Sequence, residues 1–311
     1  RSTQSRSSAA SDVYKRQILT THAQGYRQQE MVGSALFPRV PVAVSGGQVL
    51  EFGKEAFRLY NARRAPGANT KRIEFGYLGK PFALVQDALE GKLPIEHIRD
   101  ASQVPNIQLG QRSVNTVMRS LLLALEVEQA EIARSANNYD ADHKVDLSAA
   151  KWSDAGGDPA KDVRAGREAI RETIGVYPNT LLISAKAFAG AAENPKVLER
   201  FKYTSSDSVT AEMLARLMDV DRVVVGKAVG ADAQGNFSDV WGADAVLAYV
   251  APEASSIEEP SYGYTYTLDG HPLVEQSYYD NSAKSWIYPV TMERRPVLTG
   301  ITAGFLFQNA G

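Results

Sequence analysis

The side chains most often used in catalysis or metal binding are scattered along this chain of 311 residues. Its four histidines, His22, His97, His143 and His271, lie far apart, and none belongs to a ligand motif such as HExxH. The chain has no cysteine, which excludes disulfides, thiolate nucleophiles and cysteine-ligated metals. We therefore expect each histidine to lie at the surface, and we predict no metal site and no cofactor.

Other short motifs also fail to indicate an enzyme. No GxSxG, GxGxxG or paired-carboxylate arrangement stands out, so we predict no catalytic residues. Gly46-Gly47 and Gly53-Lys54 superficially resemble a phosphate loop, but their spacing is wrong and Glu55 replaces the required Ser or Thr. The sequon at Asn236 is assigned no role, because nothing else in the sequence indicates secretion.

Composition restricts the classes of partner. With 44% apolar residues the chain is able to bury real cores, and its length suggests about two domains. The net charge of -2 argues against tight binding to nucleic acid or to an anionic membrane. No apolar run approaches the roughly 20 residues that a membrane span needs, so no membrane partner is expected.

The element around which the chain is organised is one long helix, predicted between Leu109 and Asn138. Arg112, Arg119, Glu126, Glu128 and Glu131 are expected to point away from its apolar stripe. The apolar residues recur every three or four positions: Val114, Val117, Met118, Leu121, Leu122 and Leu125. We expect Val114, Met118, Leu121 and Leu125 to form the core contacts of this helix, which at 1.5 Å per residue is roughly 37 Å long.

Before the helix, the sequence predicts three segments. An arm covers residues 18–44, and its two prolines favour extended backbone. Either this arm packs on its own body or on a neighbouring subunit, or the segment is a frayed terminus. A long β-hairpin with a basic tip covers residues 45–81, and a short helix is predicted at residues 82–91. Because an isolated hairpin is marginally stable, we expect contact with another subunit. The candidate contact residues are Arg63, Arg64, Arg72, Phe75 and Tyr77.

After the helix, alternating patterns predict an α/β unit of about 100 residues followed by long antiparallel strands. Asp158 fits the N-cap, Pro159 the first position and Gly175 the C-cap of a helix. Three strands are predicted at residues 181–184, 223–225 and 245–250, helices at residues 185–192, from Pro195 and at residues 210–219, and a loop at residues 226–237. The predicted fold class is α+β.

The order of several short motifs is similar to that of a known family. The motifs are Trp152-Ser153-Asp154, Asp158-Pro159, Asp162-Val163, Thr173-Ile174-Gly175, Tyr177-Pro178-Asn179-Thr180, Val224 to Ala228, Val240-Trp241-Gly242, Ala251-Pro252 and Pro260 to Thr265. Behind a long helix and a hairpin, they resemble the major capsid proteins of tailed bacteriophages with the Hong Kong 97-type fold. The resemblance covers residues from about Ser34 to the end of the sequence.

The resemblance implies a structural protein of the virion with a characteristic layout. Hexamers and pentamers would tile an icosahedral capsid around double-stranded DNA, which contacts the near-neutral subunits weakly and without sequence specificity. Scaffold, portal and decoration proteins are the further partners, and the host bacterial cytoplasm is the place of assembly. The expected parts are a non-native leader at 1–17, the arm at 18–44, the extended hairpin at 45–81, a peripheral domain at 82–158, an axial domain at 159–264 and returning C-terminal strands at 265–311.

Two other functions stay open at this stage. An encapsulin-like nanocompartment has the same fold but encloses a cargo enzyme. A soluble α/β enzyme or ligand-binding domain is the alternative from a different class, and in it the loop at residues 226–242 would line a pocket.

Some members of the family join a hairpin lysine to an asparagine of a neighbouring subunit. Lys54, Lys71 and Lys80 are candidates here, but the reaction also needs a carboxylate in an apolar setting, and no motif fixes that geometry. We predict no cross-link. Denaturing electrophoresis of mature particles should show one band near the subunit mass of 33.8 kDa. A ladder of covalent oligomers would contradict the prediction.

Overall fold

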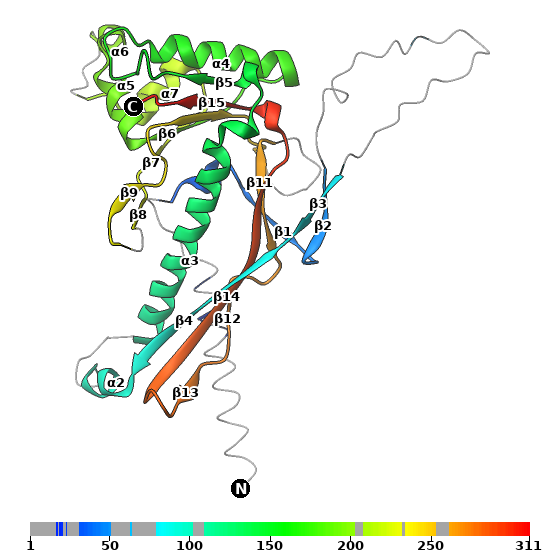
Figure 1. Ribbon diagram of the computed structural model, residues 1–311, viewed down its shortest axis with the longest axis vertical. Coiled ribbons are helices and arrows are strands. Elements are labelled where there is room, and N and C mark those ends of the chain that lie inside the picture. Colours follow the sequence, from blue (N-terminus) through cyan, green and yellow to red (C-terminus); the bar gives the residue numbers. More distant parts are fainter. Residues whose placement is uncertain are drawn as a thin grey trace.

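The computed structural model describes residues 17, 19, 20, 23, 31–50, 63, 79–101, 109–202, 208–231, 234–252 and 261–311. Figure 1 shows an elongated molecule. A five-stranded sheet and its helices form one end, the long strands β4 and β14 reach the other end, and the long helix α3 runs between the two regions. The architecture is α+β, as predicted from the sequence.

The five-stranded sheet has the strand order β5-β15-β10-β6-β7. Its strands are β5 (Lys144–Asp146), β6 (Thr180–Ser184), β7 (Arg222–Gly226), β10 (Ala245–Ala248) and β15 (Gly304–Gln308). The helices packed around it are α4 (Pro159–Ile174), α5 (Ala185–Glu193), α6 (Pro195–Phe201) and α7 (Ala211–Met218). Trp152, Ile170, Leu181 and Phe307 lie fully buried in the shared core.

Local sequence signals set the ends of α4. The Asp158 side chain accepts a hydrogen bond from the Lys161 backbone N–H at 3.1 Å, and Pro159 begins the helix. Gly175 has a φ of 74°, in the left-handed region that favours glycine at a helix C-terminus. These three predictions are confirmed. The loop predicted at residues 226–237 instead contains β8 (Val229–Ala231), which pairs with β9 (Phe237–Asp239) in a two-stranded ribbon.

The second sheet is six-stranded and is built around β14 (Ser285–Leu298). The other members are β1 (Arg39–Val42), β4 (Val85–Pro94), β11 (Gly263–Leu268), β12 (Leu273–Val274) and β13 (Tyr278–Asp280). β1 pairs in parallel with β11, so this part of the arm packs on its own body. The long antiparallel strands predicted near the C-terminus are confirmed.

The short helix predicted at residues 82–91 is wrong. β3 (Gly79–Ala83) and β4 occupy the segment, and β4 pairs with β14 from Val85 opposite Arg294 to Pro94 opposite Ser285. Ten residues of strand pairing outweigh the modest helix propensity of a sequence rich in Ala, Leu, Gln and Glu. The helix in this region, α2 (Ile95–Ala101), begins directly after Pro94.

The base of the predicted hairpin is present as an antiparallel ribbon of β2 (Gly46–Leu50) and β3. Most of the hairpin beyond it, including Arg64, Arg72, Phe75 and Tyr77, lies outside the described residues. Arg63 is described and is exposed.

The long helix α3 (Leu109–Arg134) begins at the predicted residue and ends about one turn before the predicted end at Asn138. A short 3-10 turn at Ala136–Asn138 comes next. Val114, Met118 and Leu121 are buried, whereas Leu125 is half-buried. The three buried residues pack with Val290 and Met292 of β14. The other 3-10 turns among the described residues are Gly33–Ala35, Ala141–His143 and Ile301–Ala303.

One glutamate of α3 and two histidines are more buried than the sequence predicted. Glu126 of α3, expected at the surface, has 2% of its area exposed. His143 and His271 are also buried, whereas His97 is exposed as predicted. His143 tolerates burial because its ring nitrogens lie 2.6 Å from Asp140 Oδ1 and 3.1 Å from Thr173 Oγ1. His22 lies outside the described residues.

The apolar stripe of α3 generates a stability prediction. Replacing the buried Leu121 by Ala should lower the free energy of unfolding by about 2–5 kcal/mol, because transfer energy is lost and a cavity is left. Arg119→Ala, at an exposed position half a turn away, is the matched control and should change it far less. Chemical unfolding of the unassembled subunit measures both. Equal losses would mean that the wrong face of α3 was assigned to the core.

Candidate functional site at the junction of the long helix and the two sheets

Glu126 occupies the point where α3, the arm and the five-stranded sheet meet. Its Oε1 accepts hydrogen bonds from the Val32 backbone N–H at 2.9 Å and from Trp241 Nε1 at 2.7 Å. Its Oε2 accepts from the Gly33 backbone N–H at 2.8 Å. Trp241 lies in the segment leading into β10, so one carboxylate joins three parts of the chain that are distant in sequence.

Burial sets the protonation behaviour of this carboxyl group. Desolvation raises the pKa of Glu126 above its usual value of 4.5, and the hydrogen bonds from Trp241, Gly33 and Val32 oppose that rise. The net pKa is raised because desolvation is the largest effect. Glu126 is thus a buried acid whose charged form depends on three fixed donors.

Two further polar contacts continue along the same helix. Gln129 Nε2 donates to Thr265 Oγ1 at 2.9 Å, and that hydroxyl donates to the Phe37 carbonyl at 3.1 Å. Near the end of α3, Arg134 Nε lies 2.6 Å from Asp244 Oδ2. These contacts bind the helix to β11, to the arm and to the segment before β10.

Arg294 of β14 makes the corresponding connection toward the other end of the molecule. Its side chain is 2% exposed and lies 3.0 Å from Glu128 Oε2 of α3 and 2.9 Å from Asp87 Oδ2 of β4. It also donates to the Leu121 carbonyl at 3.3 Å. Burial lowers the pKa of this guanidinium, and the two carboxylates act in the opposite direction.

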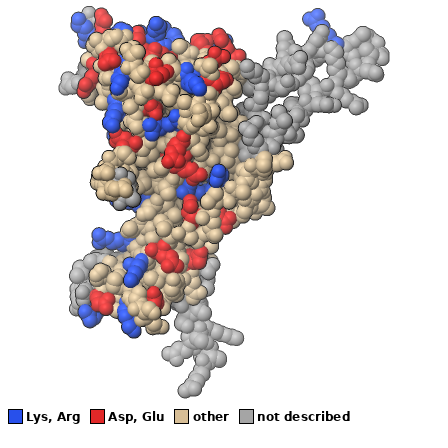
Figure 2. Space-filling view, in the orientation of Figure 1, with Lys and Arg blue, Asp and Glu red and all other residues tan. Residues whose placement is uncertain are grey.

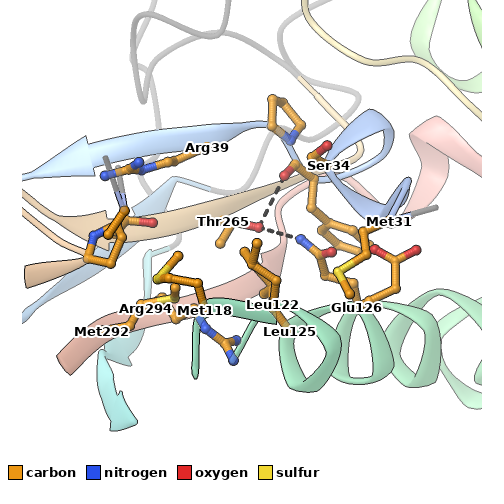
Figure 3. Close-up of a pocket in the computed structure, with 16 residues that line it drawn as sticks. Met31, Ser34, Arg39, Met118, Leu122, Leu125, Glu126, Thr265, Met292 and Arg294 are labelled. Carbon is orange, nitrogen blue, oxygen red and sulfur yellow. Dashed lines mark hydrogen bonds between the residues drawn. The ribbon is translucent and has the colours of Figure 1, made fainter. Parts of the chain in front are cut away.

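A cavity of about 340 Å³ lies between these two charged groups. Figure 3 shows Glu126 and Arg294 on different parts of its wall, with Met118, Leu122 and Leu125 of α3 along one side. Gln129 of α3, the arm, β11, β14 and Pro272, directly before β12, supply the rest of the lining. No histidine or lysine is among the lining residues that the structure describes, and the cavity is mostly apolar. The cavity is thus a mostly apolar space between elements that polar contacts join.

The structure also bears on a ligand pocket at the 226–242 loop, on a metal site and on a membrane span. Neither this cavity nor a second one between β4 and α3 contains any described residue of the 226–242 loop. Among the described residues, no group of three or more His, Asp or Glu side chains is placed to hold a metal ion. None of the described helices is both long and apolar enough to cross a membrane.

Sequence reasoning missed Glu126, Trp241 and Arg294 as residues that hold the molecule together. A signal for Glu126 was available, because it lies four residues after Leu122 and three before Gln129 on the same helical face. No comparable signal exists for Arg294, whose partners come from residues 87, 121 and 128 and are brought together only by the fold.

The raised pKa of Glu126 predicts a pH dependence of stability. An acid with a folded-state pKa above its unfolded value contributes full stability below the unfolded pKa and loses that contribution as the pH rises through the folded pKa. The free energy of unfolding of the wild type should therefore fall, relative to Glu126→Gln, as the pH rises above about 4.5. Denaturant titrations from about pH 4 to about pH 8 measure the difference.

Glu131→Gln, at an exposed position of α3, is the matched control for the loss of one negative charge. A difference between wild type and Glu126→Gln that stays constant over the whole range would contradict the prediction.

Comparison with known proteins agrees with the motifs found in the sequence. The family model of phage major capsid protein E matches residues 129–257. The major capsid protein of Burkholderia phage BcepMu is 36% identical over 294 residues, which cover 93% of this chain and 94% of that protein. The similarity therefore extends over nearly the full length of both chains.

Solved structures show the same fold. A phage-related protein from Bordetella bronchiseptica is 54% identical, with a TM-score of 0.82 and coverage of 94% of this chain and 96% of that chain. The bacteriophage PhiM1 mature capsid protein matches at 14% identity and a TM-score of 0.52, covering 91% and 88% of the two chains.

The SrpI encapsulin of Synechococcus elongatus matches at 13% identity and a TM-score of 0.54, again covering 91% and 88%. At such identities the last two matches show the fold alone, which is the Hong Kong 97-type capsid fold. The full-length similarity to the BcepMu protein goes further: this chain belongs to the family of bacteriophage major capsid proteins.

Proposed function

We propose that this protein forms hexamers and pentamers that tile an icosahedral shell around the double-stranded DNA of a tailed bacteriophage. The observation that carries the proposal is the 36% identity to a phage major capsid protein along nearly all of both chains. The likeness to an encapsulin at 13% identity concerns the fold alone, so we favour a genome over a cargo enzyme as the content of the shell.

Weak contact with the packaged DNA fits the distribution of charge. The chain has 34 basic and 36 acidic residues, and Figure 2 shows the two signs intermixed over the visible face. Nucleic-acid affinity increases with the number of phosphates that a protein neutralises, so a mixed surface leaves the DNA free to move during packaging. We propose scaffold, portal and decoration proteins as further partners, and the host cytoplasm as the place of assembly.

We propose a layout of arm, extended hairpin, peripheral domain and axial domain. In it, the peripheral domain contains α3 and β4, and the axial domain is the five-stranded sheet with its helices. β5 pairs with β15 of that sheet, which supports a boundary shortly after Arg134 rather than at residue 158. The C-terminal residues serve both domains, since β14 pairs with β4 and β15 pairs with β10.

Expression of the full chain tests the proposed function. We expect purified protein to elute as a megadalton assembly on size exclusion, and electron micrographs to show closed icosahedral particles made of hexamers and pentamers. Particles that lack a packaged genome but retain a co-expressed enzyme would favour the nanocompartment. A stable monomer or dimer under all assembly conditions would overturn both shell functions.

A further inference from the structure

The ribbon of β8 and β9 presents an uncovered apolar face. Val229 pairs with Asp239 and Ala231 pairs with Phe237, so these four side chains share one face of the ribbon, which is apolar except for Asp239 at its base. Phe237 has 78% of its area exposed and Val229 has 49%. A phenylalanine this exposed leaves a large apolar surface in water, which marks a candidate contact surface.

The base of the ribbon is fixed to the body, so this face has a defined position. Lys186 Nζ lies 2.9 Å from Asp239 Oδ2, and the Val240 backbone N–H donates to the Ala228 carbonyl at 3.0 Å. Ala228 and Val240 are both buried. Beyond the Asp239–Lys186 pair, Val229 and Phe237 stay exposed, and such a two-stranded ribbon gains stability when these apolar side chains are covered.

A second apolar patch lies on the opposite flank of the molecule. Val44, between β1 and β2, is 62% exposed, and Val85, the first residue of β4, is 43% exposed. The Leu84 backbone N–H donates to the Ser45 carbonyl at 2.8 Å, so Val44 and Val85 each adjoin one partner of the same hydrogen bond. Figure 1 shows β8 and β9 on one flank of the elongated body and β2 and β3 on the other.

Resting on the proposed function, we infer that the β8–β9 face of one copy packs against the Val44–Val85 patch of the next copy. Capsid subunits associate with copies of themselves, and both surfaces are apolar. The two surfaces are also flanked by charges of opposite sign. On the β8–β9 side Asp239 is already paired with Lys186 and Lys227 is exposed, while on the other side Glu293 accepts a hydrogen bond from Ser45 Oγ beside Val44. Because two different surfaces meet, the contact is head to tail. Successive copies form a closed ring when the rotation from one copy to the next closes after a whole number of copies.

Exposed residues can be changed without loss of the subunit fold, which makes the contact testable. In the full chain, Phe237→Asp and Val44→Asp should each leave the thermal unfolding of the unassembled subunit unchanged, while the fraction of protein in particles falls at least tenfold. Ser238→Asp is the matched control, since Ser238 is exposed on the other face of the same ribbon, and it should assemble as the wild type does.

A charge pair tests whether the two patches meet. Combining Phe237→Asp with Val44→Lys places opposite charges at every head-to-tail contact, and particles should return, whereas Phe237→Lys with Val44→Lys should not assemble. Normal assembly of Phe237→Asp, or failure of the opposite-charge pair to recover particles, overturns the inference. Absence of particles from the wild type itself would instead contradict the proposed function.

Discussion

The structure depends on the burial of one carboxylate in the middle of its longest helix. A buried charge is costly unless fixed donors surround it, and Glu126 receives three, from Val32, Gly33 and Trp241. The donors come from the arm and from the segment before β10, so they meet only when both are docked against α3. The desolvation cost of one group therefore couples the placement of three segments, and the native arrangement is the one that satisfies it.

In the opposite half of the molecule, Arg294 of β14 couples α3 and β4, because it pairs with Glu128 on α3 and with Asp87 on β4. Apolar contacts alone would let a helix slide or rotate against a sheet at small cost, because they are not directional. Charged groups with fixed partners remove that freedom. An elongated subunit with two sheets at different heights along one helix thus behaves as one body, which a shell requires because subunit geometry determines curvature.

Much of this architecture is readable from the sequence where local signals decide it. The ends of α4 follow from Asp158 and Gly175, whose roles need no tertiary partner. Two wrong predictions, a helix at residues 82–91 and an exposed Glu126, share one cause: both depend on contacts with residues distant in sequence. Residues 82–91 form strands because β14 lies beside them, and Glu126 is buried because donors distant in sequence converge on it. The sequence analysis assigned Glu126 to the polar face because of its charge, although it lies four residues after Leu122, and the missing information was the identity of its partners.

The contrast between the inside and the outside of the subunit bears on how a shell assembles. Inside, Glu126 and Arg294 find their main polar partners within one chain, so these contacts do not need a second copy. Outside, the apolar surfaces at Phe237 and Val44 are small and lie on separate flanks. Small contacts are individually weak and reversible, so a misplaced copy can dissociate and rebind in the correct orientation. In the contact proposed above each copy uses both of its surfaces at once, one toward each neighbour, and together they hold it more firmly than either does alone. A rigid subunit with modest contact surfaces therefore allows errors to be corrected during growth and still gives a stable final particle.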